Sequence, residues 1–183
     1  MSTGYQIYDQ RGYYFLTFQV VEWTNIFNRV SYRDIVIESF KYCVAHKHLR
    51  VHAWVIMSNH IHCILSSEKK NLSDIIRDLK SFSSKQMLLE LQNGAERRRV
   101  WLEMIFRYAA RGHNRNKYFQ IWTHENHAVE LHSMEFLSQK LNYIHNNPVR
   151  ARIVASPEHY LDSSALDYYH QKQIGPIPIS FFS

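Results

Sequence analysis

Hydrophobic and polar positions alternate with two different periods along the chain, and each period predicts one kind of element. Residues 12–21 (GYYFLTFQVV), 49–57 (LRVHAWVIM) and 60–67 (HIHCILSS) are rich in aromatic and β-branched side chains, which predicts three strands. Ser58 and Asn59 form a short polar break between the second and third of them, which predicts an antiparallel hairpin. A shorter run at 118–122 is also strand-like.

Four longer segments follow the helical period: 31–48, 71–92, 100–110 and 131–147. We expect Ser31 to cap the first helix and Pro148 to end the last one, because proline cannot continue a helix. The predicted apolar stripes of the first two helices are Val36, Phe40, Cys43 and Val44, and Leu72, Ile75, Leu79 and Phe82.

The order strand, helix, strand, strand, helix, followed by a strand and a C-terminal helix, indicates an α+β fold. We expect a ferredoxin-like, RRM-like antiparallel sheet with helices on one face, so that the other face is open for function. A length of 183 residues with 45% hydrophobic residues favours one globular domain over 1–183, with an irregular tail from about residue 155.

The composition narrows the cellular setting. No apolar run approaches the roughly 18 residues of a membrane span, and the segment MSTGYQIYDQ is polar, so we expect a cytoplasmic protein without membrane partners. Cys43 and Cys63 each lie in an apolar segment, where reduced core cysteines are expected.

Positive charge is concentrated in one stretch. The chain has a net charge of +6. Residues 97–117 hold seven basic side chains and a single acidic one, Glu103, so the net charge of this stretch alone equals that of the whole chain. A solvated surface is one explanation; contact with DNA phosphates is the other. The candidate phosphate contacts are Arg97, Arg98, Arg99, Arg111, Arg115 and Lys117, together with Lys80 and Lys85 of the helix before them.

His60 and His62 stand two apart in a predicted strand, and side chains two apart share a face. With Ile61, Cys63 and Leu65 turned to the helices, the two imidazoles lie on the open face, near enough to bind one divalent cation. The alternative is that they are ordinary polar residues on a solvated face, in a chain that has 12 histidines. A metal site would need a third ligand.

The last helix supplies candidates for that ligand and for a nucleophile. Tyr143 and Asn147 are four apart and share a helix face. The amide oxygen of Asn147 suits a hard cation, and the Tyr143 phenol can act as a nucleophile once deprotonated. A core aromatic residue and a helix-terminal asparagine before proline are the alternatives.

The segments VIMSNHIHCIL (55–65) and KLNYIHNNPVRARIV (140–154), in this order, resemble the single-tyrosine HUH transposases. They are most similar to the branch of REP-associated tyrosine transposases, within the IS200-like group. FLTFQVV, NLSDIIRDLKSF and LDSSALDYY extend the resemblance over most of the chain. Two features depart from it: Arg152 stands where many relatives have glycine, and no glycine follows Trp122.

The resemblance implies a metal-dependent endonuclease and strand transferase that acts on single-stranded DNA carrying a hairpin or palindrome. Tyr143 would form a 5′-phosphotyrosine intermediate, and His60, His62 and Asn147 would hold Mg²⁺ or Mn²⁺. From their position before the last helix, His127, or else His124, is a candidate auxiliary base or phosphate contact; an exposed or structural histidine is the alternative. Relatives include monomers acting in cis and homodimers acting in trans. Two rival interpretations stay open: a domesticated DNA-binding protein without transposition activity, and a hydrolase that uses water as nucleophile.

Overall fold

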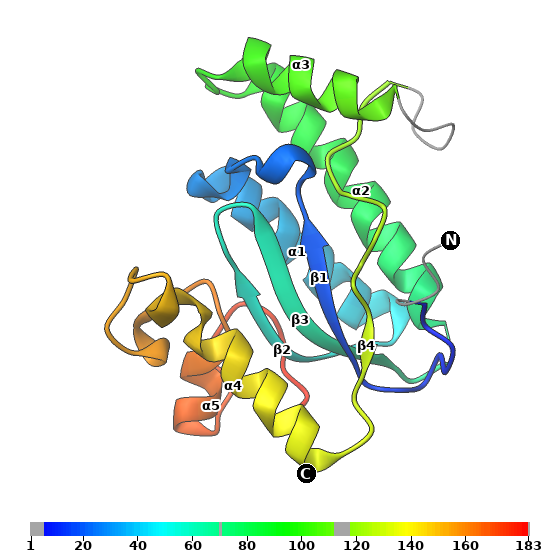
Figure 1. Ribbon diagram of the computed structural model, residues 1–183, viewed down its shortest axis with the longest axis vertical. Coiled ribbons are helices and arrows are strands. Elements are labelled where there is room, and N and C mark those ends of the chain that lie inside the picture. Colours follow the sequence, from blue (N-terminus) through cyan, green and yellow to red (C-terminus); the bar gives the residue numbers. More distant parts are fainter. Residues whose placement is uncertain (1–5, 70, 112–117, 183) are drawn as a thin grey trace.

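The computed structural model describes residues 6–69, 71–111 and 118–182 and contains a four-stranded antiparallel sheet (Figure 1). The strands are β1 (Tyr14–Gln19), β2 (Leu49–Ile56), β3 (His60–Ser67) and β4 (Val129–Glu130), in the order β2-β3-β1-β4. This order, with helices between the strands, is the predicted ferredoxin-like arrangement. The predicted β2–β3 hairpin is confirmed, and Ser58 and Asn59 lie in its turn region.

Register places the two histidines in the interior of the sheet. β3 has β2 on one side and β1 on the other. His62 stands opposite Val55 of β2 and opposite Thr17 of β1, and His60 stands opposite Gln19. The backbone that carries the two histidines is therefore held by hydrogen-bonded strands on both sides, because β3 is not an edge strand.

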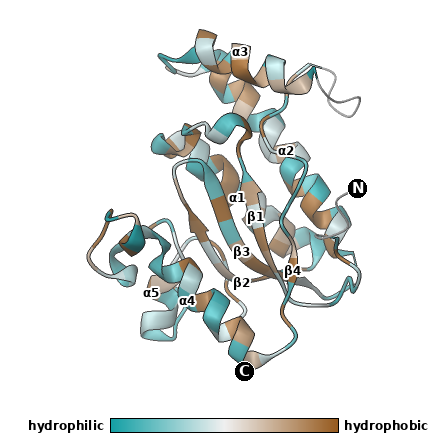
Figure 2. Cartoon of the chain, in the orientation of Figure 1, coloured by the Kyte–Doolittle hydropathy of each residue, from teal (hydrophilic) through white to brown (hydrophobic). Residues whose placement is uncertain are grey.

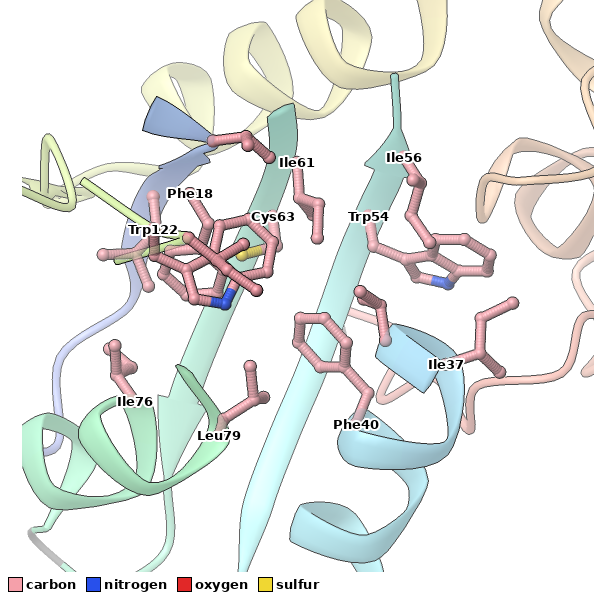
Figure 3. Packing of buried hydrophobic residues seen from close by; sticks show 14 of the residues in the cluster. Phe18, Ile37, Phe40, Trp54, Ile56, Ile61, Cys63, Ile76, Leu79 and Trp122 are labelled. Carbon is pink, nitrogen blue, oxygen red and sulfur yellow. The ribbon is translucent and has the colours of Figure 1, made fainter. Parts of the chain in front are cut away.

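Two helices cover one face of the sheet, as the apolar periodicity predicts. They are α1 (Val30–Lys47) and α2 (Leu72–Asn93), and Ile61, Cys63 and Leu65 of β3 belong to the core beneath them. Figure 3 shows Phe40 of α1 and Leu79 of α2 pointing toward the strands in this core. Figure 2 shows brown, apolar segments along the central strands, with teal, polar segments between them.

Two details of these helices differ from the prediction. Helix α1 begins at Val30 with Arg29 as its N-cap residue and no side-chain cap bond, so the predicted Ser31 cap is wrong. Phe82 is 48% exposed and stacks on Tyr42 of α1 instead of entering the core. A third helix, α3 (Arg99–Ala110), follows α2 and agrees with the predicted segment.

The opposite face of the sheet is partly covered, so the expectation of an open face is wrong there. Helix α4 (Met134–Arg150) packs on β2 and β3, and α5 (Ala165–His170) follows it (Figure 1). A second apolar cluster joins Leu137 and Ile144 of α4 to Phe15, Val55 and Ile64 of the sheet. The supposedly irregular tail contains α5 and the short helix η3 (Pro157–His159).

Helix α4 continues past Pro148 and ends at Arg150, so the predicted end at Asn147 is wrong. Proline in the last turn removes only its own bond to the preceding turn, and the following amides keep theirs. The Ala151 amide donates to the Asn147 carbonyl at 3.0 Å and the Ile153 amide to the Pro148 carbonyl at 2.9 Å.

The fourth strand lies later in the chain than predicted. Residues 118–122 form only an isolated bridge, between Trp122 and Val20, while β4 comes at 129–130. Ile121 and Trp122 enter the core instead, where Trp122 packs against Phe18 and Phe27. None of the helices in the described part of the chain has the length and apolar character needed to cross a membrane.

Candidate metal and tyrosine site

The two histidines of β3 lie side by side on the face that α4 partly covers. Their ring centroids are 4.6 Å apart and the rings are inclined by 66°. Ile64, on the same face, belongs to the cluster beneath α4, while Ile61 and Cys63 belong to the opposite core. The strand period therefore assigned the faces correctly.

The hydrogen bond of His60 fixes which ring nitrogen can serve as a ligand. Its Nδ1 lies 2.7 Å from the side-chain oxygen of Asn59, and the amide nitrogen of Asn59 donates to the Trp23 carbonyl at 3.2 Å. Because that oxygen can only accept, the His60 Nδ1–H donates to it, and the lone pair is on Nε2. A partner on the second nitrogen is the usual arrangement for a metal-bound histidine.

His62 has the same kind of partner. Its Nδ1 lies 2.9 Å from the hydroxyl oxygen of Thr17, the residue opposite it in the β1–β3 ladder. The Thr17 hydroxyl can accept from Nδ1–H or donate to Nδ1, so this contact orients the ring and is compatible with a lone pair on Nε2. Each imidazole is thus oriented by a neutral oxygen on its Nδ1 side, and for His60 this partner fixes the lone pair on Nε2.

Both imidazoles are held in their neutral form. Burial lowers the pKa of His60. The pKa of His62 falls to about 3, chiefly because of burial and to a smaller degree because His60 and Lys140 are nearby. A metal-binding histidine must be neutral, so the electrostatics of this pair suit a cation ligand at neutral pH.

Helix α4 brings Tyr143 to the same place within one chain. The Tyr143 ring centroid lies 5.2 Å from that of His62, and an edge-to-face contact at 5.8 Å joins it to Phe15. Two cations approach the phenol ring: Lys140 Nζ is 5.8 Å and the Arg150 guanidinium 5.3 Å from its centroid. Positive charge here suits a phosphate beside the tyrosine.

Asn147 follows Tyr143 by one turn on the same face of α4 and is half-buried. Across residues 6–69, 71–111 and 118–182, no three His, Cys, Asp or Glu side chains are grouped so as to hold a metal ion. A cation at His60 and His62 would therefore need a ligand of another type. The Asn147 amide fits that need in chemistry, and its role as a ligand stays a prediction.

The proposed auxiliary histidines lie near this site. His124 and His127 line a hollow of about 420 Å³ together with Gln19 and Glu22. Gln19 is the ladder partner of His60, so the hollow adjoins the histidine pair along β1. His127 has a left-handed backbone with φ of 43°.

The predicted phosphate contacts fall into distinct settings. Lys80 is engaged within the protein, donating to the Thr123 carbonyl at 2.7 Å and to the Asn126 side-chain oxygen at 2.6 Å. Burial lowers its pKa to about 8. Lys80 and the exposed Lys85 line a hollow of about 700 Å³ between α2 and residues 119–126.

The arginines are more exposed. Arg98 forms an ion pair with Glu96 at 3.2 Å and Arg99 one with Glu103 at 2.9 Å. Arg97 and Arg111 are exposed near the two ends of α3. Arg115 and Lys117 lie outside the described residues. DNA contact by this group stays a prediction.

Sequence reasoning missed the residues that orient the site. Thr17 and Asn59 hold the two histidines, and Lys140 and Trp23 flank them. Asn59 adjoins His60 in sequence and could have been considered. Thr17 could be found only from the strand register, which local patterns do not give.

Comparisons with known proteins identify the family and the fold. No match is found among curated proteins. The solved structure of a REP-associated tyrosine transposase bound to a REP hairpin is similar in fold, with a TM-score of 0.62 and 17% identity, covering 100% of this chain and 96% of that one. The family model described as transposase IS200 like matches residues 10–120. The chain thus belongs to the IS200-like transposase family.

Proposed function

We propose that this protein cuts and rejoins single-stranded DNA through a covalent bond between Tyr143 and a 5′-phosphate. One observation carries the proposal: Tyr143 lies beside His62 in the same chain, with ring centroids 5.2 Å apart. Family membership supplies the reaction class, because the chain is an IS200-like transposase by its matched residues 10–120. Together they support a tyrosine nucleophile rather than a core aromatic residue.

In the proposed step, the Tyr143 phenol loses its proton and its oxygen attacks the scissile phosphorus. The phosphorus–oxygen bond to the preceding nucleotide breaks, and its oxygen takes up a proton to become a free 3′-hydroxyl. Attack by another 3′-hydroxyl on the phosphotyrosine reverses the step and releases the tyrosine. Because one phosphoester replaces another, joining requires no nucleotide cofactor.

His60, His62 and Asn147 are the residues proposed to hold a Mg²⁺ or Mn²⁺ ion. The ion would supply Lewis-acid polarisation of the phosphate and offset its developing charge. The hydrogen bonds between the histidine Nδ1 atoms and the side chains of Thr17 and Asn59 support this assignment, since they engage Nδ1 of each ring and leave Nε2 for a metal ion. Lys140 and Arg150 add positive charge beside the attacking phenol.

A hairpin-bearing single strand is the proposed partner. The structurally similar transposase is bound to a REP hairpin, and the exposed basic residues around α3 suit phosphate contacts. The alternative is a domesticated DNA-binding protein of the same fold. It predicts binding of such strands without cleavage.

The test incubates the protein with Mn²⁺ and a library of labelled hairpin oligonucleotides, followed by denaturing electrophoresis and mass spectrometry. We expect a tyrosine–DNA adduct on Tyr143 that disappears in Tyr143→Phe and in His60→Ala but persists in Tyr169→Phe, an exposed tyrosine of α5. An adduct that survives Tyr143→Phe refutes the nucleophile. Cleavage without any linked protein supports a hydrolase, and binding without cleavage supports the domesticated protein.

A further inference from the structure

Trp23 is an exposed tryptophan at the edge of the histidine pair. Its side chain is 60% exposed, while Trp54 and Trp122 are in the core at 0% and 4%. The Trp23 ring lies edge-to-face with His60, with ring centroids 6.2 Å apart. Trp101 of α3 is also exposed, at 46%, so exposure alone does not distinguish Trp23; its contact with His60 does.

The backbone is held in an unfavourable conformation to place this ring. Glu22 and Trp23 have φ values of 52° and 51°, the left-handed region that side chains other than glycine rarely adopt. They lie in η1 (Val21–Trp23), directly after β1. A strained backbone of this kind persists only when contacts with neighbouring residues hold it in place.

Those contacts tie Trp23 to the site. The Asn59 side chain donates to the Trp23 carbonyl at 3.2 Å and accepts from His60 at 2.7 Å. One asparagine therefore positions both the tryptophan and a proposed metal ligand. A strand whose phosphate lies at His60 would bring a neighbouring base within reach of the Trp23 ring.

The charge around Trp23 suits a nucleic acid. Helix α3 packs beside η1, at the end of the sheet where β3 begins (Figure 1). The Arg98 guanidinium donates to the Asn25 carbonyl at 3.3 Å, two residues after Trp23. Arg98 is also paired with Glu96. An exposed aromatic ring near a basic side chain is a combination that binds unpaired bases and their phosphates.

We propose that Trp23 is a stacking platform for one unpaired base next to the scissile phosphate. The proposal rests on the proposed function, because it takes the single strand to lie across His60 and His62. It adds a base-binding subsite to the phosphate site. Stacking accepts any base, so this subsite would orient the strand without reading its sequence.

The test measures binding of fluorescein-labelled dT12 by anisotropy, without metal, against a 12-mer of the same phosphates and abasic sugars. We expect Trp23→Ala to weaken dT12 binding by about fivefold to a hundredfold and to leave abasic binding unchanged. Trp23→Phe should bind dT12 nearly as the wild type does. Tyr169→Ala removes an equally exposed aromatic ring on α5 and should change neither.

The outcomes separate this proposal from the one it rests on. Equal losses on dT12 and the abasic strand, or no loss on either, overturn the stacking platform, while the Tyr143 adduct assay stays valid. No dT12 binding by the wild type, together with no adduct, overturns both proposals. If sedimentation velocity shows that Trp23→Ala instead dissociates a dimer, and the dT12 affinity is unchanged, the ring binds protein and the proposal is wrong.

Discussion

Replacing Thr17 by valine tests whether its hydroxyl holds His62 in the orientation needed for metal binding. Valine keeps the β-branched shape and the strand preference and removes only the hydroxyl. That hydroxyl is 2.9 Å from His62 Nδ1 across the β1–β3 ladder. Without it the imidazole loses the partner that orients its Nδ1 side, so part of the population no longer presents Nε2 to the ion.

The expected size follows from two independent arguments. Loss of the group that orients a metal-bound histidine typically costs about 10- to 100-fold in metal affinity, or about 1.4 to 2.7 kcal/mol. His62 is only 7% exposed, so water cannot readily replace the lost partner. An unpaired buried donor costs about 1 to 3 kcal/mol, which is the same range. We therefore expect Mn²⁺ binding to weaken by about tenfold or more.

The assay is a Mn²⁺ titration followed by electron paramagnetic resonance, without DNA, so that binding is separated from turnover. Thr17→Ser should bind Mn²⁺ within about threefold of the wild type, which is about 0.7 kcal/mol, because serine keeps the hydroxyl. Urea unfolding of each variant shows whether the fold is intact. A folded Thr17→Val protein with wild-type Mn²⁺ affinity refutes the role of the hydroxyl, and so does an equal loss in Thr17→Ser.

Two predictions concern stability. Burial lowers the pKa of His52 and His145 to about 4, below the value of about 6.5 in an unfolded chain. The unfolded state therefore binds more protons between these pH values, and the free energy of unfolding should fall from pH 6.5 toward 4, by up to about 3 kcal/mol per histidine. Urea unfolding at pH 7.5, 6 and 5 measures this, and His145→Gln should flatten the curve. Arg152 has a left-handed backbone with φ of 59°, so Arg152→Gly should raise the free energy of unfolding by about 0.5 to 1 kcal/mol. Arg111→Gly is the control, because Arg111 has a right-handed backbone and glycine should not stabilise it. Equal effects of the two substitutions in urea unfolding would show that Arg152 is not strained.

Local periodicity was enough to predict most of the elements and the faces of the central strand. The prediction for β3, residues 60–67, agrees with the structure residue for residue. The alternation of apolar residues also separated Ile61 and Cys63 from the histidines. These features depend on neighbours within a few positions, which a sequence displays directly.

Features that depend on distant partners could not be predicted in the same way. Thr17 meets His62 because of the β1–β3 register, and the register is set by the whole sheet. The run at 118–122 looks like a strand, yet the burial of Trp122 against Phe18 and Phe27 takes it into the core. Pro148 was expected to end α4, but a proline in the final turn removes too little to do so.

The position of Tyr143 follows from two neighbouring stripes on α4. Leu137, Leu141, Ile144 and Pro148 share one stripe with helical spacing, and the cluster beneath α4 includes the first three of them. Lys140, Tyr143, Asn147 and Arg150 follow the same spacing one residue earlier, so they lie on the adjacent stripe. The apolar stripe fixes the rotation of the helix on its own sheet, and this rotation turns the chemical stripe toward His62. Because Ile144 packs with Phe15 and Ile64, the contacts that set the rotation of α4 are also the ones that place Tyr143 beside His62.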